Sequence, residues 1–183
     1  MQKLGMLSLF FILAALVCAA ANTPQSAAKV ADNSISMVER EVVPLAEAMP
    51  ADKYAFAPSS GEFKGVRTFG QQMTHIATVI YEVAAAMLSE KAPVDLGTNE
   101  NGAASLQSKD AAVKYLKDAF AYAHKAMATL TDKNMFEQIK SPFGNETAAR
   151  MSLAAVPVWH TYDHYGQAVV YARMNGVIPP ASR

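Results

Sequence analysis

Two histidines, His160 and His164, stand four positions apart in the stretch VPVWHTYDHYGQ of the 183-residue sequence. In an α-helix this spacing places both imidazoles on one face, one above the other. Two imidazoles arranged in this way can offer two nitrogen ligands to one metal ion. Because two ligands do not complete a metal site, the pair predicts a metal centre only if a third ligand comes from elsewhere in the chain.

His75, in the segment FGQQMTHIATVIYE, is a candidate for the third ligand. It falls at the edge of an apolar helix face, with Thr68, Gln72 and Glu82 on its own side. This position suits a ligand at the wall of a polar pocket, and it also suits an ordinary surface histidine. The fourth histidine, His124, falls on the apolar face of another predicted helix, where a hydrogen-bonded structural role is expected.

The four histidines fall in segments that are predicted to be helices. In four segments apolar side chains recur at alternating spacings of three and four, which is the periodicity of an α-helix. No segment shows the strict alternation of a half-buried strand. The four apolar stripes comprise Ile35, Val38, Val42, Leu45 and Met49; Val66, Phe69, Met73, Ile76, Ile80, Val83 and Met87; Val113, Leu116, Phe120, Ala123, Met127 and Leu130; and Met151, Ala155, Val158, Tyr162, Tyr165 and Val169. The sequence therefore predicts an all-α four-helix bundle.

Segments rich in Pro, Gly, Ser and Asn separate the predicted helices and are expected to be loops. These segments span residues 50–65, 91–109 and 131–145. The second and third segments are long enough for a crossover along the bundle. The last helix is expected to begin with a cap at Asn145 or Thr147 and to end at Gly176.

The last predicted helix carries a second stripe on roughly its opposite side. This stripe comprises Leu153, Val156, His160, His164, Gln167, Tyr171 and Met174. A helix that is apolar on both sides is normally covered on both, so the histidines are expected to face the bundle interior or a partner. Pro157, one turn before His160, is expected to kink the helix or to bend it around the core. Gln167 and Tyr171 share the face of the histidines and are candidates to support the ligands through hydrogen bonds.

The first residues have the features of a secretory signal peptide. Residues 1–21 combine a short basic start, an apolar run and small residues before a cleavage site. The expected product is exported to the periplasm or secreted, with no stable membrane insertion once the signal is cleaved. An uncleaved signal that anchors the protein in the membrane is the alternative. Residues 22–32 are expected to be disordered or a linker, and residues 33–183 to form a single bundle domain.

Composition and charge argue against several classes of protein. Cys18 is the only cysteine and lies within the predicted signal, so the mature protein is expected to have neither disulfides nor a cysteine ligand. Sixteen basic and sixteen acidic residues give a formal net charge of zero. No basic block interleaves with aromatic residues, which argues against nucleic-acid binding.

Two segments of the sequence resemble the DinB-like superfamily of damage-inducible bundle proteins. HTYDHYGQAVVYARMNGVIPP is similar to the family's final-helix pattern, and FGQQMTHIA is similar to its second-helix segment with a single histidine. The resemblance extends over nearly the whole predicted domain and implies a four-helix bundle with a long crossover connection. It also implies that His75, His160 and His164 bind one divalent ion, which is nickel, zinc or iron, near one end of the bundle.

Three imidazole ligands leave a coordination position for water or substrate, as in catalytic metal sites. We therefore expect an exported, metal-dependent, hydrolase-like enzyme that acts on an unidentified small molecule. Family members that use low-molecular-weight thiols make a thiol-dependent transferase an alternative, although such thiols are mainly cytosolic. A further alternative is a non-catalytic metal-binding or stress-related bundle that acts as an interaction protein and forms a homodimer through the apolar face of its last helix.

Overall fold

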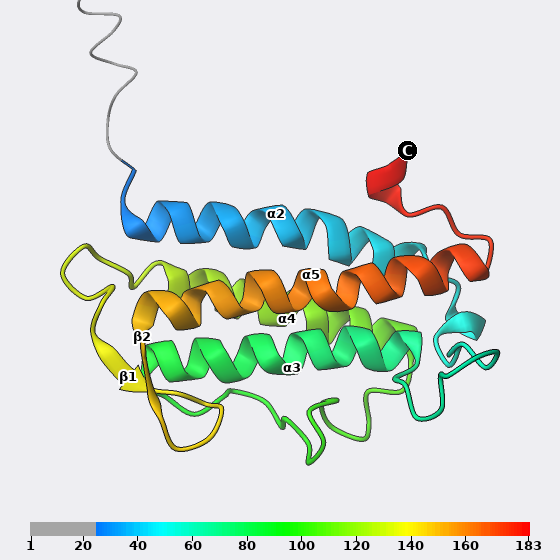
Figure 1. Ribbon diagram of the computed structural model, residues 1–183, viewed down its shortest axis with the longest axis horizontal. Helices are drawn as coiled ribbons and strands as arrows, with labels where there is room; N and C mark the ends of the chain where they lie inside the picture. The colour runs from blue at the N-terminus through cyan, green and yellow to red at the C-terminus, as the bar shows by residue number, and fades with distance from the viewer. Residues whose placement is uncertain (1–24) are drawn as a thin grey trace, which may run out of the picture.

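The computed structural model describes residues 25–183, in which four long helices pack side by side along one axis (Figure 1). They are α2 (Ala27–Ala48), α3 (Phe69–Leu88), α4 (Lys109–Met127) and α5 (Arg150–Met174). The other described elements are the 3-10 helices η1 (Ala51–Lys53) and η2 (Pro180–Ser182) and the strands β1 (Gln138–Lys140) and β2 (Thr147–Ala149). The prediction of an all-α four-helix bundle is confirmed.

The long crossover of the bundle is the connection between α3 and α4. α3 packs against α4 and α5, and α2 packs against the same two helices from the opposite side. α3 and α4 run in the same direction, so residues 89–108 must return along the length of the bundle (Figure 1). The connection between α4 and α5 joins neighbouring ends instead. The sequence indicates two connections long enough for a crossover, residues 91–109 and 131–145, and only the one between α3 and α4 forms one.

Side-chain caps determine where three of the helices begin. Ser26 and Ser108 each accept a hydrogen bond from the backbone amide three residues further on, at 3.2 Å. Thr68 and Gln71 form a reciprocal capping box at the start of α3. Each cap satisfies an amide that has no partner within its own helix.

The bundle begins earlier than the sequence pattern predicts. α2 starts at Ala27, so the expectation that residues 22–32 form a linker is wrong from that position onward. Ala27 and Ala31 are buried against the core. Their small side chains make a weak apolar pattern, which is why the first stripe does not predict this part of the helix.

The predicted signal peptide, residues 1–21, lies outside the described part of the chain. Within residues 25–183, no helix is both long enough and apolar enough to cross a bilayer. The apolar faces of α2, α3 and α4 are instead directed at one another, and the burial of these side chains stabilises the bundle. Their largest fully buried side chains are Ile35, Leu45, Phe69, Met73, Ile76, Ile80, Met87, Leu116, Phe120 and Met127.

These side chains confirm the predicted stripes of α2, α3 and α4, with two exceptions. Val66 precedes α3 and is 36% exposed, and Val113 of α4 is only half-buried.

α5 directs to the core the side that carries its second predicted stripe, of which Leu153, Val156, His164 and Tyr171 are buried. The stripe from Met151 to Val169 is half-buried or exposed. Many of the buried side chains of α5 are small ones from neighbouring positions, namely Ala154, Pro157, Thr161, Ala168 and Ala172. The helix continues through Pro157. Because small side chains let a helix approach its neighbours closely, this face sets α5 against the bundle with His160 and His164 turned toward α3.

A small β-hairpin that the sequence pattern does not predict precedes α5. β1 pairs antiparallel with β2, and Ile139 lies opposite Ala148. Strands of three residues are too short to show a recognisable alternation. Of the two positions expected to cap the helix, Asn145 lies in the hairpin loop and Thr147 lies in β2, so α5 begins only at Arg150.

The C-terminal end of α5 lies close to Gly176, where the sequence predicts that the helix ends. Gly176 adopts a φ of +75°, which favours glycine. The amide of Val177 donates to the carbonyl of Ala172 at 2.9 Å, and that of Gly176 donates to the carbonyl of Arg173 at 3.0 Å. This pair of bonds is the usual termination of a helix by a left-handed glycine.

Candidate metal centre

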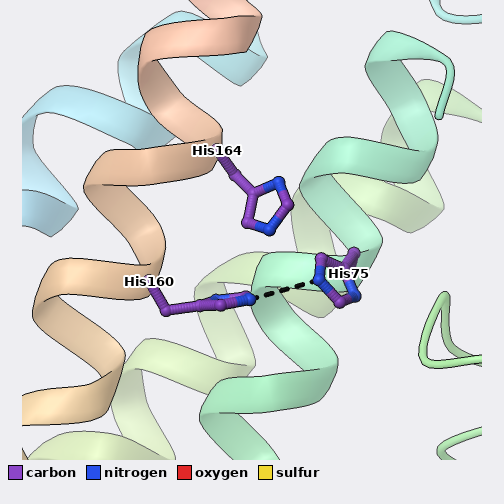
Figure 2. A group of neighbouring side chains, drawn as sticks. All are labelled: His75, His160 and His164. Atoms are coloured by element: carbon purple, nitrogen blue, oxygen red, sulfur yellow. Dashed lines mark hydrogen bonds between the residues drawn. The ribbon is translucent and has the colours of Figure 1, made fainter. Parts of the chain in front are cut away.

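His75 of α3 and His160 and His164 of α5 point toward one another across the interface between the two helices (Figure 2). One ring nitrogen of each histidine lies within 4.8 Å of those of the other two. The Nε2 atoms of His75 and His160 are 3.1 Å apart. The structure thus brings together the three histidines that the sequence predicts as ligands.

The crossover connection orients His75. The Nδ1 atom of His75 donates to the backbone carbonyl of Glu100 at 2.7 Å. Because a carbonyl oxygen only accepts, Nδ1 carries the hydrogen and the lone pair of Nε2 faces the other two histidines. A single backbone oxygen from the loop therefore selects the tautomer that a metal ligand needs.

The loop packs closely against α4 and α3 next to this point. Glu100 itself has a φ of +57°, and nearby Gly102 has a φ of +75°. A Cβ at Gly102 would lie 2.7 Å from the side chain of Leu106 and 3.1 Å from the ring of Tyr115, so only glycine fits without rearrangement. Sequence reasoning missed Glu100 because its contribution is a backbone carbonyl of a loop, which no residue type signals.

A chain of hydrogen bonds orients His164. Its Nδ1 atom lies 2.6 Å from Oε1 of Gln72. The Nε2 atom of Gln72 donates to Oε1 of Gln167 at 3.0 Å, and Nε2 of Gln167 donates to a carboxylate oxygen of Asp163 at 3.4 Å. Gln167, which the sequence marks as a supporting residue, belongs to this chain. Gln72 is the partner that the sequence analysis did not single out, although it precedes His75 by one helical turn.

The order of donors and acceptors in this chain determines the tautomer of His164. The carboxylate of Asp163 only accepts, so the amide nitrogen of Gln167 must face it. The amide oxygen of Gln167 then accepts from Gln72, which leaves the oxygen of Gln72 to accept from Nδ1 of His164. The lone pair of Nε2 in His164 is therefore free to bind a metal ion.

His160 has a different environment from the other two histidines. Within the described residues, its buried Nδ1 atom has no hydrogen-bond partner. Its Nε2 atom faces the Nε2 lone pair of His75, and two lone pairs at that distance repel unless a proton or a cation lies between them. Two nitrogens bound tetrahedrally to one zinc ion are about 3.3 Å apart. The observed spacing of 3.1 Å is that of a hydrogen bond between the two nitrogens, and it is also close to the spacing that a shared metal ion would impose.

All three imidazoles are held in the neutral form. Burial lowers the pKa of His75. Burial, reinforced by His164, His75 and the positive charge of Arg67, lowers the pKa of His160 to about 3. Burial, with His75, lowers the pKa of His164 to about 4, against the opposing effect of Asp163. At neutral pH the three lone pairs are therefore available without the release of a proton.

Two cavities follow one another along the α3–α5 interface, with the histidines between them. A polar cavity of about 490 Å³ contacts His164 and is lined by Arg67, Gln71, Gln72, Asn101 and Gln167. A smaller cavity of about 260 Å³ contacts His75 and His160 and is lined mainly by the apolar side chains of Val79, Phe143, Val156 and Trp159, with Glu100 as its one acidic residue. Three cavities of 480 to 520 Å³ elsewhere in the described residues contain no histidine, so volume alone does not identify the site.

The remaining candidates lie outside the cluster. Tyr171, predicted to support the ligands, packs edge-on against Phe56 at a ring-centroid distance of 5.8 Å. Among the described residues no hydrogen bond joins its side chain to a histidine. His124 lies between α4 and α2, where Asp32 and Glu39 contact its two ring nitrogens. The structural role predicted for His124 agrees with this position.

Comparisons with known proteins agree with the fold. The sequence profile of the DinB superfamily matches residues 35–168. The crystal structure of a DinB-like protein from Bacillus cereus superimposes with a TM-score of 0.64 at 15% identity, covering 81% of this chain and 92% of the other. A DinB-like protein from Bacillus subtilis superimposes with a TM-score of 0.54 at 18% identity, covering 79% and 92%. No curated protein matches the chain by sequence.

Proposed function

The chain belongs to the DinB superfamily, and we propose that its three clustered histidines hold one divalent metal ion in a hydrolase-like enzyme that acts on a small molecule. The observation that carries this proposal is the convergence of three neutral imidazoles within 4.8 Å. The outer nitrogens of His75 and His164 are already engaged by hydrogen bonds that point their lone pairs inward. Nickel, zinc and iron all accept imidazole ligands of this kind.

The surroundings of the three histidines favour catalysis over storage of a metal ion. When bound, a divalent ion with three imidazole ligands acts as a Lewis acid and lowers the pKa of a coordinated water. Two cavities adjoin the histidines and provide room for a small-molecule substrate. The amide groups of Gln72 and Gln167 hold the His164 ring in place, which keeps the reaction geometry constant.

Asp163 is our candidate to accept a proton during the reaction. Its carboxylate oxygen lies 3.9 Å from Nε2 of His164. The side chain is 67% exposed, so it can exchange the proton with solvent. Replacement by asparagine should lower the hydrolysis rate by about 10²- to 10⁴-fold, the usual contribution of a general base. Metal content should stay unchanged, because the side-chain oxygen of asparagine still accepts a hydrogen bond from Gln167.

We propose that the enzyme acts after export. The support comes from the sequence of residues 1–21, which has the basic, apolar and small-residue regions of a signal peptide. Intact-mass measurement on protein recovered from the periplasm or the medium tests this proposal. A mass that retains these residues would contradict cleavage and favour a membrane anchor.

Elemental analysis of natively purified protein, followed by hydrolysis assays, tests the enzyme proposal. The assays should cover esters, lactones and amides, each with and without a chelator. The proposal predicts one divalent ion per chain and at least one hydrolysis reaction that the chelator abolishes and the ion restores. The His124→Ala variant is the matched control, because it removes a histidine that lies outside the cluster.

The possible outcomes separate the alternatives. Metal binding without chelator-sensitive turnover of any substrate would overturn the hydrolase proposal and favour a non-catalytic bundle. A protein that neither carries nor takes up a divalent ion would overturn the metal site itself.

A further inference from the structure

We propose, building on the metal site above, that the enzyme binds amphiphilic carboxylates. In this proposal Arg67 holds the carboxylate on one side of the histidines, and Trp159 and Phe143 hold an apolar group on the other. The two cavities differ in chemistry and adjoin the same three imidazoles. A ligand that carries both kinds of group would contact both cavities and lie beside the three histidines.

Arg67 has unused hydrogen-bonding capacity in the polar cavity. Its Nε atom donates to the side-chain oxygen of Asn101 at 2.8 Å, which orients the guanidinium. Within the described residues its terminal nitrogens have only the carboxylate of Glu100 nearby, at 3.9 Å, beyond hydrogen-bonding distance. The side chain is 32% exposed. A guanidinium held in this way presents two parallel N–H groups to a carboxylate.

The charge of the polar cavity matches a monoanion. Arg67 is its one formally charged lining residue, and the other polar side chains are the neutral amides of Gln71, Gln72, Asn101 and Gln167. Neutral amides donate hydrogen bonds to a carboxylate but do not balance a second negative charge. A carboxylate therefore fits this cavity better than a phosphate dianion does.

Glu100 sets a limit on how tightly an anion binds there. Its carboxylate is 57% exposed and lies close to Arg67, so it competes with an incoming carboxylate. Its carboxylate also lies 4.0 Å from Nδ1 of His75, but that nitrogen donates its hydrogen bond to the backbone carbonyl. Replacing the side chain alone therefore tests the competition without disturbing that hydrogen bond.

The apolar cavity presents two aromatic rings to solvent. Trp159 is 59% exposed and Phe143 is 43% exposed, whereas Val79 beneath them is buried. The Trp159 ring lies edge-on to the His160 ring at a centroid distance of 6.0 Å. Phe143 comes from the loop of the β-hairpin, where its amide donates to Oγ of Ser141 at 3.1 Å. Two exposed aromatic rings beside a ligand cluster are suited to bind an apolar group.

Tryptophan fluorescence measures this binding directly, because Trp159 is the only tryptophan in the chain. The probes are a series of phenylalkanoates from phenylacetate to 8-phenyloctanoate, titrated into metal-free protein and into zinc-loaded protein. The matched neutral probes are the corresponding phenylalkanols, and butanoate is the probe without an aromatic ring. We expect saturable changes in fluorescence with the phenylalkanoates, with an optimum chain length that reports the span between the two cavities.

Variants of Arg67 and Glu100 test whether the carboxylate of a phenylalkanoate binds in the polar cavity. Arg67→Gln should weaken phenylalkanoate binding by about ten- to hundred-fold, which is the usual effect of losing a charge-assisted hydrogen-bonded pair, and should leave phenylalkanol binding unchanged. Arg67→Lys should retain part of the affinity because it retains the charge. Glu100→Gln should tighten phenylalkanoate binding several-fold. Arg40→Gln, at an exposed position on α2, is the control and should have no effect.

The results also separate this proposal from the metal site. Phenylalkanoate binding that is equally strong in Arg67→Gln, or that leaves Trp159 fluorescence unchanged, would overturn the proposal even if zinc binds with one ion per chain. Equal affinity for the phenylalkanols would overturn it as well. Failure of the proposed metal site has a different signature, namely intact phenylalkanoate binding to a protein that takes up no zinc in calorimetric titration.

Discussion

A single histidine, His124, joins α2 and α4, whereas a cluster of three histidines joins α3 and α5, and the two sets of surroundings shift the histidine pKa in opposite directions. Both ring nitrogens of His124 on α4 contact carboxylates of α2, Asp32 at 2.6 Å and Glu39 at 3.1 Å. Burial lowers the pKa of His124, but the hydrogen bonds to Glu39 and Asp32 outweigh it, so the pKa is raised. Between α3 and α5 the imidazoles face one another, and burial dominates the lowered pKa of His160.

The difference shows how surroundings assign a role to a histidine. An imidazole that donates from both nitrogens is a cation, which holds helices together but has no lone pair for a metal ion. An imidazole with one engaged nitrogen keeps a lone pair on the other. The bundle thus uses histidine as an ion-pair partner between α2 and α4 and as a candidate ligand between α3 and α5.

The largest expected effect follows from removing a ligand. His160→Ala or His164→Ala should lower zinc or nickel affinity by more than about 100-fold, which exceeds the usual loss from removing a residue that only supports a ligand. His124→Ala should leave affinity unchanged. The bundle should persist in all three variants, because its core is apolar. Calorimetric metal titration and circular dichroism provide the measurements, and full metal content in His160→Ala would eliminate the proposed site.

Gln72→Ala tests the hydrogen-bond chain that orients His164. Loss of its side-chain oxygen frees the ring to rotate, so metal affinity should fall by about 10- to 100-fold. Gln107→Ala is the control, because Gln107 bonds only to a backbone oxygen of its own loop. Equal affinities in the two variants would show that the Gln72 chain does not hold the ligand.

His124→Ala should lower the stability of the bundle and leave the metal affinity unchanged. Removing its two carboxylate contacts should lower the free energy of unfolding by about 1–2 kcal/mol, since the side chain is partly exposed and the gain is screened. Urea denaturation monitored by circular dichroism measures the change. A variant as stable as the parent protein would mean that the contacts between α2 and α4 contribute nothing net.

The smallest expected effect is a pH dependence of stability. Because the pKa of His124 is raised in the folded state, its contribution is fully present below the unfolded pKa of about 6.5 and is lost as pH rises through the folded value. The stability difference between the parent protein and His124→Ala should therefore shrink from pH 6 to pH 9, by about 1 kcal/mol or less. Urea midpoints across this range measure the trend, and a constant difference would contradict it.

How well the sequence predicts the buried face of each helix depends on the size of the side chains on that face. Large apolar residues such as Ile80 and Phe120 mark the buried faces of α3 and α4, and the periodicity identifies them. The buried face of α5 includes Ala154 and Ala168, whose weak signal is lost beside the larger residues of the same helix. Short strands such as β1 leave no periodicity to recognise.

In the candidate site, too, some features are predicted by the sequence and others are shown only by the structure. The three histidines follow from their residue type and from the spacing of His160 and His164. The contact of Glu100 with His75 depends on the path of a loop, which residue types do not specify. Gln167 is predicted from its place on the same helix face as the histidines. Gln72 is a neutral amide of a kind that is common on helix surfaces, so only the packing of α3 against α5 shows what it does.

His75 and His160 are 85 residues apart in the chain, although their rings meet. At ordinary rates of about 5–20 residues per second, a ribosome reaches His160 roughly 4 to 17 seconds after His75. A nascent chain that ends before α5 has only one of the three imidazoles and cannot capture a metal ion tightly. Metal loading must therefore be a late step of maturation, completed only after the last helix of the bundle docks beside the crossover.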